Sequence, residues 1–117
     1  MRHRNKKAIL GRPSDQRKAL MRNLLTSFFE HGSLQTTQAK AKALKSAAEK
    51  LVTKARRKDD MNAIRELKKV LYTETASRNA LQFARTSKRL SGFTRATKVR
   101  YRAGDNALMV VVELIQD

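Results

Sequence analysis

Between residues 14 and 31 the apolar side chains return every three or four positions, which is the spacing of one face of a helix. The repeating residues are Leu20, Met21, Leu24, Leu25, Phe28 and Phe29. Ser14 can serve as the N-cap of this helix, Asp15 suits its positive first turn, and Gly32 can end it. Residues 33–36 then form a short extended link with the length of one strand.

The same periodicity predicts three more helices. Thr37 can cap a helix over 37–57, and Asp59 with Asp60 can stop that helix and cap the next one. Thr73 and Glu74 open a weaker fourth helix that extends to about residue 88. The residues predicted to face the core from these helices are Leu44, Ala47, Ala48, Leu51, Val52, Ala55, Ile64, Leu67, Leu71, Ala76, Ala80, Leu81 and Ala84.

After Gly92 the pattern changes to that of β-strands. Residues 93–102 are rich in Thr, Val and aromatic side chains, and Val99 and Tyr101 alternate with Lys98, Arg100 and Arg102. A Gly-Asp-Asn turn separates this run from a Val-rich run over 107–115, which predicts a β-hairpin. Because the second run is apolar at nearly every position, we predict that it is covered on both faces or central in its sheet.

The first 13 residues carry five Lys or Arg and no acid, and they show neither helical nor strand periodicity. We predict an extended basic arm over 1–13, followed by a single globular domain over 14–117. Charge alone fits a solvated, disordered tail equally well. Ile9 and Leu10 favour the arm, because a purely solvated tail has no need of apolar residues.

The distribution of charge points to a polyanionic partner. Twenty-seven Lys and Arg against 10 Asp and Glu give a formal net charge of +17. Residues 1–22 hold eight basic residues and one acid, 40–58 eight and one, and 85–102 seven and none, whereas 59–80 hold four of each. Such an excess repels itself unless a polyanion neutralises it. Arginines near Phe93 and Tyr101 favour structured RNA, since both residue types stack on bases, although the two aromatics also suit an ordinary core.

Several functions are disfavoured by what the sequence lacks. It has no cysteine, no Gly-rich phosphate loop and no nucleophile motif, and His3 and His31 lack the spacing of a metal site. The longest apolar run, 107–112, is too short to span a bilayer. We therefore expect a soluble cytoplasmic protein that is not an enzyme and needs no cofactor, metal, membrane or small-molecule substrate.

Three spaced segments carry a recognisable pattern over nearly the whole chain. The first is Met1-Arg2-His3-Arg4 with Leu10, Arg12, Ser14, Arg17, Ala19 and Arg22-Asn23. The second runs from Leu34 through Thr36-Thr37, Ala41-Lys42, Glu49 and Leu51-Val52-Thr53-Lys54. The third is Gly92-Phe93-Thr94-Arg95, then Arg102 to Ala107 and Glu113-Leu114. In this order the segments resemble the bacterial large-subunit ribosomal protein L17 family.

The resemblance implies an α/β protein of the α+β type, in which a small mixed sheet with a C-terminal β-hairpin packs against about four helices. It also implies a structural constituent of the large ribosomal subunit, bound to ribosomes near the nascent-chain tunnel exit beside other large-subunit proteins. Its partner would be large-subunit ribosomal RNA, bound mainly through phosphates and shape with little base readout. From the motifs and the basic segments, the predicted RNA-binding residues are Arg2, His3, Arg4, Lys6, Lys7, Arg12, Arg17, Arg22, Lys40, Lys42, Arg95, Lys98, Arg100 and Arg102. Arg102 is also placed to support the hairpin turn.

Two other functions compete with this interpretation. The first two helices could form a DNA-binding helix-turn-helix, although the link over 32–37 is longer than the usual turn of about three or four residues. The basic faces could instead lie on an anionic membrane, but they lack the Trp- and Phe-rich apolar side that this role needs. Equal affinity for duplex DNA and ribosomal RNA would favour the DNA-binding function. Binding to anionic vesicles at physiological salt would favour the membrane-surface function.

Overall fold

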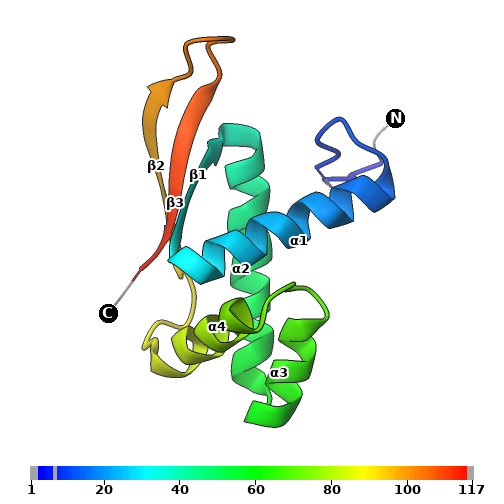
Figure 1. Ribbon diagram of the computed structural model, residues 1–117, viewed down its shortest axis with the longest axis vertical. Helices are drawn as coiled ribbons and strands as arrows, with labels where there is room; N and C mark the ends of the chain where they lie inside the picture. The colour runs from blue at the N-terminus through cyan, green and yellow to red at the C-terminus, as the bar shows by residue number, and fades with distance from the viewer. Residues whose placement is uncertain (1–2, 7, 116–117) are drawn as a thin grey trace.

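The computed structural model describes residues 3–6 and 8–115, which fold into helices packed on one side of a narrow sheet (Figure 1). In chain order the elements are α1 (Ser14–His31), β1 (Ser33–Thr37), α2 (Gln38–Arg57), α3 (Asp60–Lys68), α4 (Glu74–Thr86), β2 (Thr94–Tyr101) and β3 (Leu108–Leu114). The predicted α+β class, with four helices and a C-terminal hairpin, is confirmed for the described residues. The β2–β3 hairpin extends beyond the helices at one end of the molecule.

The sheet is antiparallel throughout, so the prediction of a mixed sheet is wrong. Its strand order is β1-β3-β2, and β3 runs opposite to both neighbours. The Leu114 amide donates to the Gly32 carbonyl (3.0 Å), and the Ile115 amide donates to the Phe93 carbonyl (2.8 Å). The end of β3 therefore lies beside the beginnings of both β1 and β2, which fixes the antiparallel direction of each pair.

The predicted central place of β3 is confirmed, and only one of its faces is buried. Val110 and Val112 lie on the helix side and are 3% and 0% exposed. Met109, Val111 and Glu113, which alternate with them, are half-buried on the opposite face. The nearly continuous apolar sequence of β3 thus reflects its central position between two strands rather than layers on both faces.

Helix α1 begins one residue earlier than predicted, and Ser14 is not its N-cap. Pro13 takes that position, with φ −60° and ψ 162°, and its carbonyl accepts the Arg17 amide (2.9 Å). Proline suits this place because its fixed φ is compatible with a helix start and it has no amide to satisfy. At the other end Gly32 adopts φ +78° and its amide donates to the Phe28 carbonyl (2.8 Å), which confirms the predicted stop.

The other helix starts agree with the sequence pattern. Thr37, Asp59 and Thr73 occupy the N-cap positions of α2, α3 and α4. Of the three, Thr73 caps through its side chain, whose hydroxyl accepts the Ala76 amide (3.2 Å). Helix α4 ends at Thr86, before the predicted residue 88, because the next residue is extended.

The core is centred on α2, which packs against the other helices and the sheet. The largest fully buried side chains of the whole core include Phe28, Phe29, Leu44, Leu67, Phe93 and Val112. Phe83, which the sequence pattern missed, meets Phe93 edge to face with ring centroids 6.1 Å apart. Phe93 is therefore a core aromatic and has no face open to a base. In α1 the buried apolar residues are Leu25, Phe28 and Phe29, whereas Leu20, Met21 and Leu24 are half-buried.

Candidate nucleic-acid interface

Three lysine side chains line one groove between α2 and the sheet. Lys42 and Lys45 come from the first half of α2 and Lys98 from β2, around a volume of about 310 Å³. Lys98 pairs with Val110 in the strand register, which turns its side chain to the helix side. None of these lysines forms an ion pair with a described residue. Three uncompensated ammonium groups therefore face one space, an arrangement that attracts a phosphate backbone.

Further cations continue this surface along α2. Lys50, Lys54 and Arg57 line a second recess of about 420 Å³ together with one acid, Glu49, and residues 91–93 close it. We call Lys42, Lys45, Lys50, Lys54, Arg57 and Lys98 together the α2 basic face. Lys40, a predicted RNA-binding residue, lines neither recess and is half-buried at the start of α2. Helical spacing from Lys42 could have added Lys45 to the prediction, whereas Lys50, Lys54 and Arg57 share a separate i, i+4, i+7 stripe of the same helix.

The cations of β2 are divided between the two faces of the sheet. Lys98 pairs with Val110 but Arg100 pairs with Met109, so Val99 is an extra, bulged residue. The predicted alternation, with Lys98 and Arg100 on one face, is therefore wrong, because a one-residue shift reverses the face. Arg95 lies on the face opposite to Lys98 and its guanidinium binds the Glu113 carboxylate (2.9 and 2.5 Å).

Arg102 supports the hairpin turn. Its Nε and Nη2 donate to the two carboxylate oxygens of Asp105 at 2.9 and 2.6 Å. The hydrogen bond from Arg102, followed by that from the Ala107 amide, lowers the pKa of Asp105 from 3.8 to about 2. Of the two roles that the sequence left open for Arg102, the structure shows the turn contact.

A second basic region lies on α1. Arg17, Lys18 and Arg22 line a recess of about 340 Å³ whose opposite wall includes Lys69 and Val70; we call it the α1 recess. Arg22 Nε donates to the Val70 carbonyl (2.8 Å), and its guanidinium lies 4.1 Å from the centroid of the Tyr72 ring. These two contacts fix the Arg22 side chain within the protein. Arg17 Nε, in contrast, is buried without an acceptor among the described residues. The sequence prediction included Arg17 and Arg22 but not Lys18 or Lys69.

The described part of the basic arm forms neither helix nor strand. His3, Arg4 and Lys6 are exposed, and His3, Arg4 and Leu10 have positive φ angles. Arg12 donates through Nη1 to the Leu10 carbonyl (2.8 Å). Arg2 and Lys7, also predicted to bind RNA, lie outside the described residues. The extended arm stays a prediction.

Each acidic residue of α3 and α4 is paired with a basic residue. Glu66 binds both Lys58 (3.0 Å) and Lys69 (3.1 Å), and hydrogen bonds from these two lysines lower its pKa. Arg78 pairs with Glu74 (2.7 Å) on α4. Exposed pairs of this kind contribute little to stability, but they reduce the positive field on this side of the molecule.

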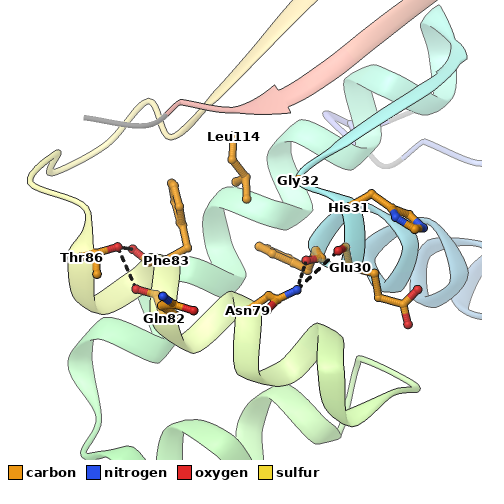
Figure 2. Close-up of a pocket in the computed structure, with 9 residues that line it drawn as sticks. Glu30, His31, Gly32, Asn79, Gln82, Phe83, Thr86 and Leu114 are labelled. Carbon is orange, nitrogen blue, oxygen red and sulfur yellow. Dashed lines mark hydrogen bonds between the residues drawn. The ribbon is translucent and has the colours of Figure 1, made fainter.

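A further recess lies between α4 and the C-terminal end of α1 (Figure 2), and its polar residues serve to complete the end of α1. It measures about 310 Å³, and Glu30, His31 and Asn79 are among its lining residues. Asn79 Nδ2 donates to the carbonyls of Phe29 (3.1 Å) and Glu30 (3.4 Å). Carbonyls of a last helical turn lack partners within the helix, so Asn79 satisfies the end of α1 from the neighbouring helix.

Other kinds of site were searched for in the same part of the chain. Residues 3–6 and 8–115 contain no group of three or more His, Cys, Asp or Glu side chains that could hold a metal ion. In these ranges no helix combines the length and the apolar character needed to cross a bilayer.

Similarity to known proteins agrees with the basic surfaces. Residues 20–115 match the family described as ribosomal protein L17. The chain is similar to large ribosomal subunit protein bL17 of Clostridium botulinum strain Hall, with 43% identity over 108 residues, 91% of this chain and 95% of that protein. The same identity and coverage relate it to large ribosomal subunit protein bL17 of Clostridium perfringens strain SM101. Because the match extends from α1 to the end of β3, the chain belongs to the ribosomal protein L17 family.

Proposed function

We propose that the chain is a structural constituent of the large ribosomal subunit that binds and stabilises large-subunit ribosomal RNA. Membership of the L17 family and the names of the Clostridium relatives support the ribosomal role. The observation that supports RNA as the ligand is the convergence of Lys42, Lys45 and Lys98 on a groove that no carboxylate of the described residues lines. The chain is bound to ribosomes in the cytoplasm and acts there as a structural component rather than an enzyme.

The proposed mechanism is charge neutralisation between RNA segments. The α2 basic face and the α1 recess each neutralise phosphates, and the basic arm adds contacts through its five Lys and Arg. Because α2 packs against α1 and against the sheet, the core holds these surfaces at a fixed separation. We also propose a position near the nascent-chain tunnel exit, beside other large-subunit proteins, which the family resemblance implies.

The DNA-binding alternative is less well supported by the geometry. In a helix-turn-helix the two helices are joined by a tight turn. Here the segment between α1 and α2 is the strand β1, paired with β3 from Ser33↔Glu113 to Thr37↔Met109. Thr37 is followed directly by α2, so the pairing fixes the first turn of α2 against the sheet.

Matched triple variants test the proposed RNA surface. Lys42, Lys45 and Lys98 are replaced together by Gln, and a control replaces Arg65, Lys68 and Arg78 on α3 and α4, with the same change in net charge. Binding to deproteinised large-subunit RNA is measured over a range of salt concentrations. Each lost phosphate contact lowers the slope of log affinity against log salt by roughly 0.7–0.9, so we expect a drop of roughly 2.1–2.7 for the groove variant and almost none for the control.

Two outcomes would contradict the proposal. Equal slopes for the groove variant and its control would show that total charge, not the groove, governs binding. Equal affinity of the natural chain for duplex DNA and for the ribosomal RNA would favour the DNA-binding alternative. Independently, a tagged chain should sediment with free large subunits and with whole ribosomes after messenger RNA has been trimmed by nuclease.

A further inference from the structure

We propose a site for one unpaired nucleotide of the bound RNA, formed by α1 and the connection between α3 and α4. Its base stacks on Tyr72 and its phosphate enters the α1 recess. The inference rests on the proposed RNA-binding function but goes beyond it. Binding through phosphates and shape alone would not require a side chain on which a base stacks.

Tyr72 has the properties of a stacking platform. Its side chain is 50% exposed, although it lies in a short connection whose backbone is fixed. The Tyr72 amide donates to the Thr26 hydroxyl (3.0 Å). The Arg22 guanidinium lies over the ring at 4.1 Å and is itself held by the Val70 carbonyl (2.8 Å). A ring supported on one face by a fixed guanidinium, with half of its surface exposed, can accept a base by stacking.

The phosphate site adjoins this ring through Arg22, which both lines the α1 recess and covers Tyr72. Arg17, Lys18 and Lys69 add three further cations around a volume of about 340 Å³, and none of the described carboxylates lines it. Lys69 is paired with Glu66, which lies outside the recess. Arg17 Nε is buried without an acceptor in residues 3–6 and 8–115, and a buried donor left unpaired is unfavourable. A phosphate in the recess would supply acceptors once the Arg17 guanidinium turns toward it.

The combination favours a nucleotide over a protein segment. Apart from the stems of its cations, the recess offers Met21 and Val70 as apolar contacts, too little for the buried core of a protein interface. An aromatic ring beside a cluster of cations instead matches the two halves of a nucleotide. The base must be unpaired, because a base inside an RNA helix has no free face for stacking on a side chain.

The test separates stacking from charge. Binding of the full chain to deproteinised large-subunit RNA is measured for the variants Tyr72→Leu, Tyr72→Phe and Arg17→Gln. The control is Met61→Ala, which alters an exposed apolar side chain on α3 away from the recess. We expect Tyr72→Leu to weaken binding roughly tenfold with an unchanged salt slope, because stacking involves no counterion. Tyr72→Phe and Met61→Ala should bind like the natural chain. Arg17→Gln should weaken binding and lower the slope by roughly 0.7–0.9.

A second measurement uses the natural chain and so does not depend on a variant folding. Iodination of Tyr72 is followed by mass spectrometry with and without the RNA, and we expect protection in the complex. Natural affinity in Tyr72→Leu, an equal loss in Tyr72→Phe, or no protection of Tyr72 would each overturn the nucleotide site. So would a Tyr72→Leu variant that binds RNA normally but is poorly retained on ribosomes, since that points to a protein partner. These outcomes leave the proposed function intact, because that function is tested separately by the salt slopes of the groove variant and by the comparison with duplex DNA.

Discussion

Leu44 and Lys45 are adjacent on α2 but have different roles. Substituting them one at a time distinguishes the contribution of α2 to core packing from its contribution to RNA binding. The Leu44 side chain is 0% exposed, whereas Lys45 lines the groove beside β2. Truncating Leu44 to Ala removes about three methylene equivalents, roughly 2.4 kcal/mol of transfer free energy at about 0.8 kcal/mol each. The cavity left behind adds to this, so we expect the free energy of unfolding to fall by about 3 kcal/mol.

Urea unfolding followed by far-ultraviolet circular dichroism measures this loss. The midpoint should fall while the m value stays constant, and Tm should fall by roughly 12 °C for a chain of this size. Under conditions where Leu44→Ala is still folded, its salt slope for RNA binding should equal that of the natural chain. Lys45→Ala should show the opposite result, with stability within about 0.5 kcal/mol and a slope lower by roughly 0.7–0.9. A loss of less than about 1 kcal/mol in Leu44→Ala, or equal slope changes in both variants, would refute this division of α2.

Three further predictions concern the ends of elements. Gly32→Ala should lower the free energy of unfolding by about 1 kcal/mol in urea, since φ is +78° and the added Cβ meets no atom within 4 Å, so the cost is conformational alone. Asn79→Ala should cost about 1 kcal/mol in the same assay, and Asn79→Asp more, because a carboxylate cannot donate to the carbonyls that end α1. The folded pKa of Asp105 is about 2, below 3.8, so its pair with Arg102 stabilises the turn fully above about pH 4 and is lost as pH falls through about 2. Amide NMR signals of the turn should follow this titration, and Asp105→Asn should abolish it.

The long elements could be predicted because their signal is local. The apolar period of α1 and α2 and the turn before β3 are contained in short stretches of sequence. Strand β1 was predicted only as a link with the length of one strand, because Ser33–Thr37 holds a single large apolar residue. Its strand character comes from pairing with β3, at the far end of the chain. The direction of the sheet depends on the same non-local pairing, so no local pattern could test the mixed sheet that the resemblance implied.

The site was harder to predict than the fold. The distribution of charge along the sequence located the basic segments, but a bulge at Val99 moved Arg100 to the opposite face from Lys98. Tyr72 lies in an irregular connection, where no periodic pattern indicates which side chains face solvent. Its contact with Arg22 joins residues that are distant in the sequence, so only the folded chain brings them together.

The net charge of +17 overstates what is available to RNA, because arginines and lysines serve different purposes in this fold. Arg22 and Arg85 bind backbone carbonyls of neighbouring segments, and Arg56 likewise binds the carbonyls of Ser87 and Arg89. The planar, forked guanidinium suits several fixed acceptors at once, whereas an ammonium group on a flexible stem remains hydrated and mobile. Accordingly, the groove between α2 and β2 is lined by lysines, Lys42 and Lys98 among them, that have no ion-pair partner among the described residues. Arginine contacts of this kind therefore fix the shape of the molecule, and the lysines of the groove supply much of the charge on the surface that we propose for RNA.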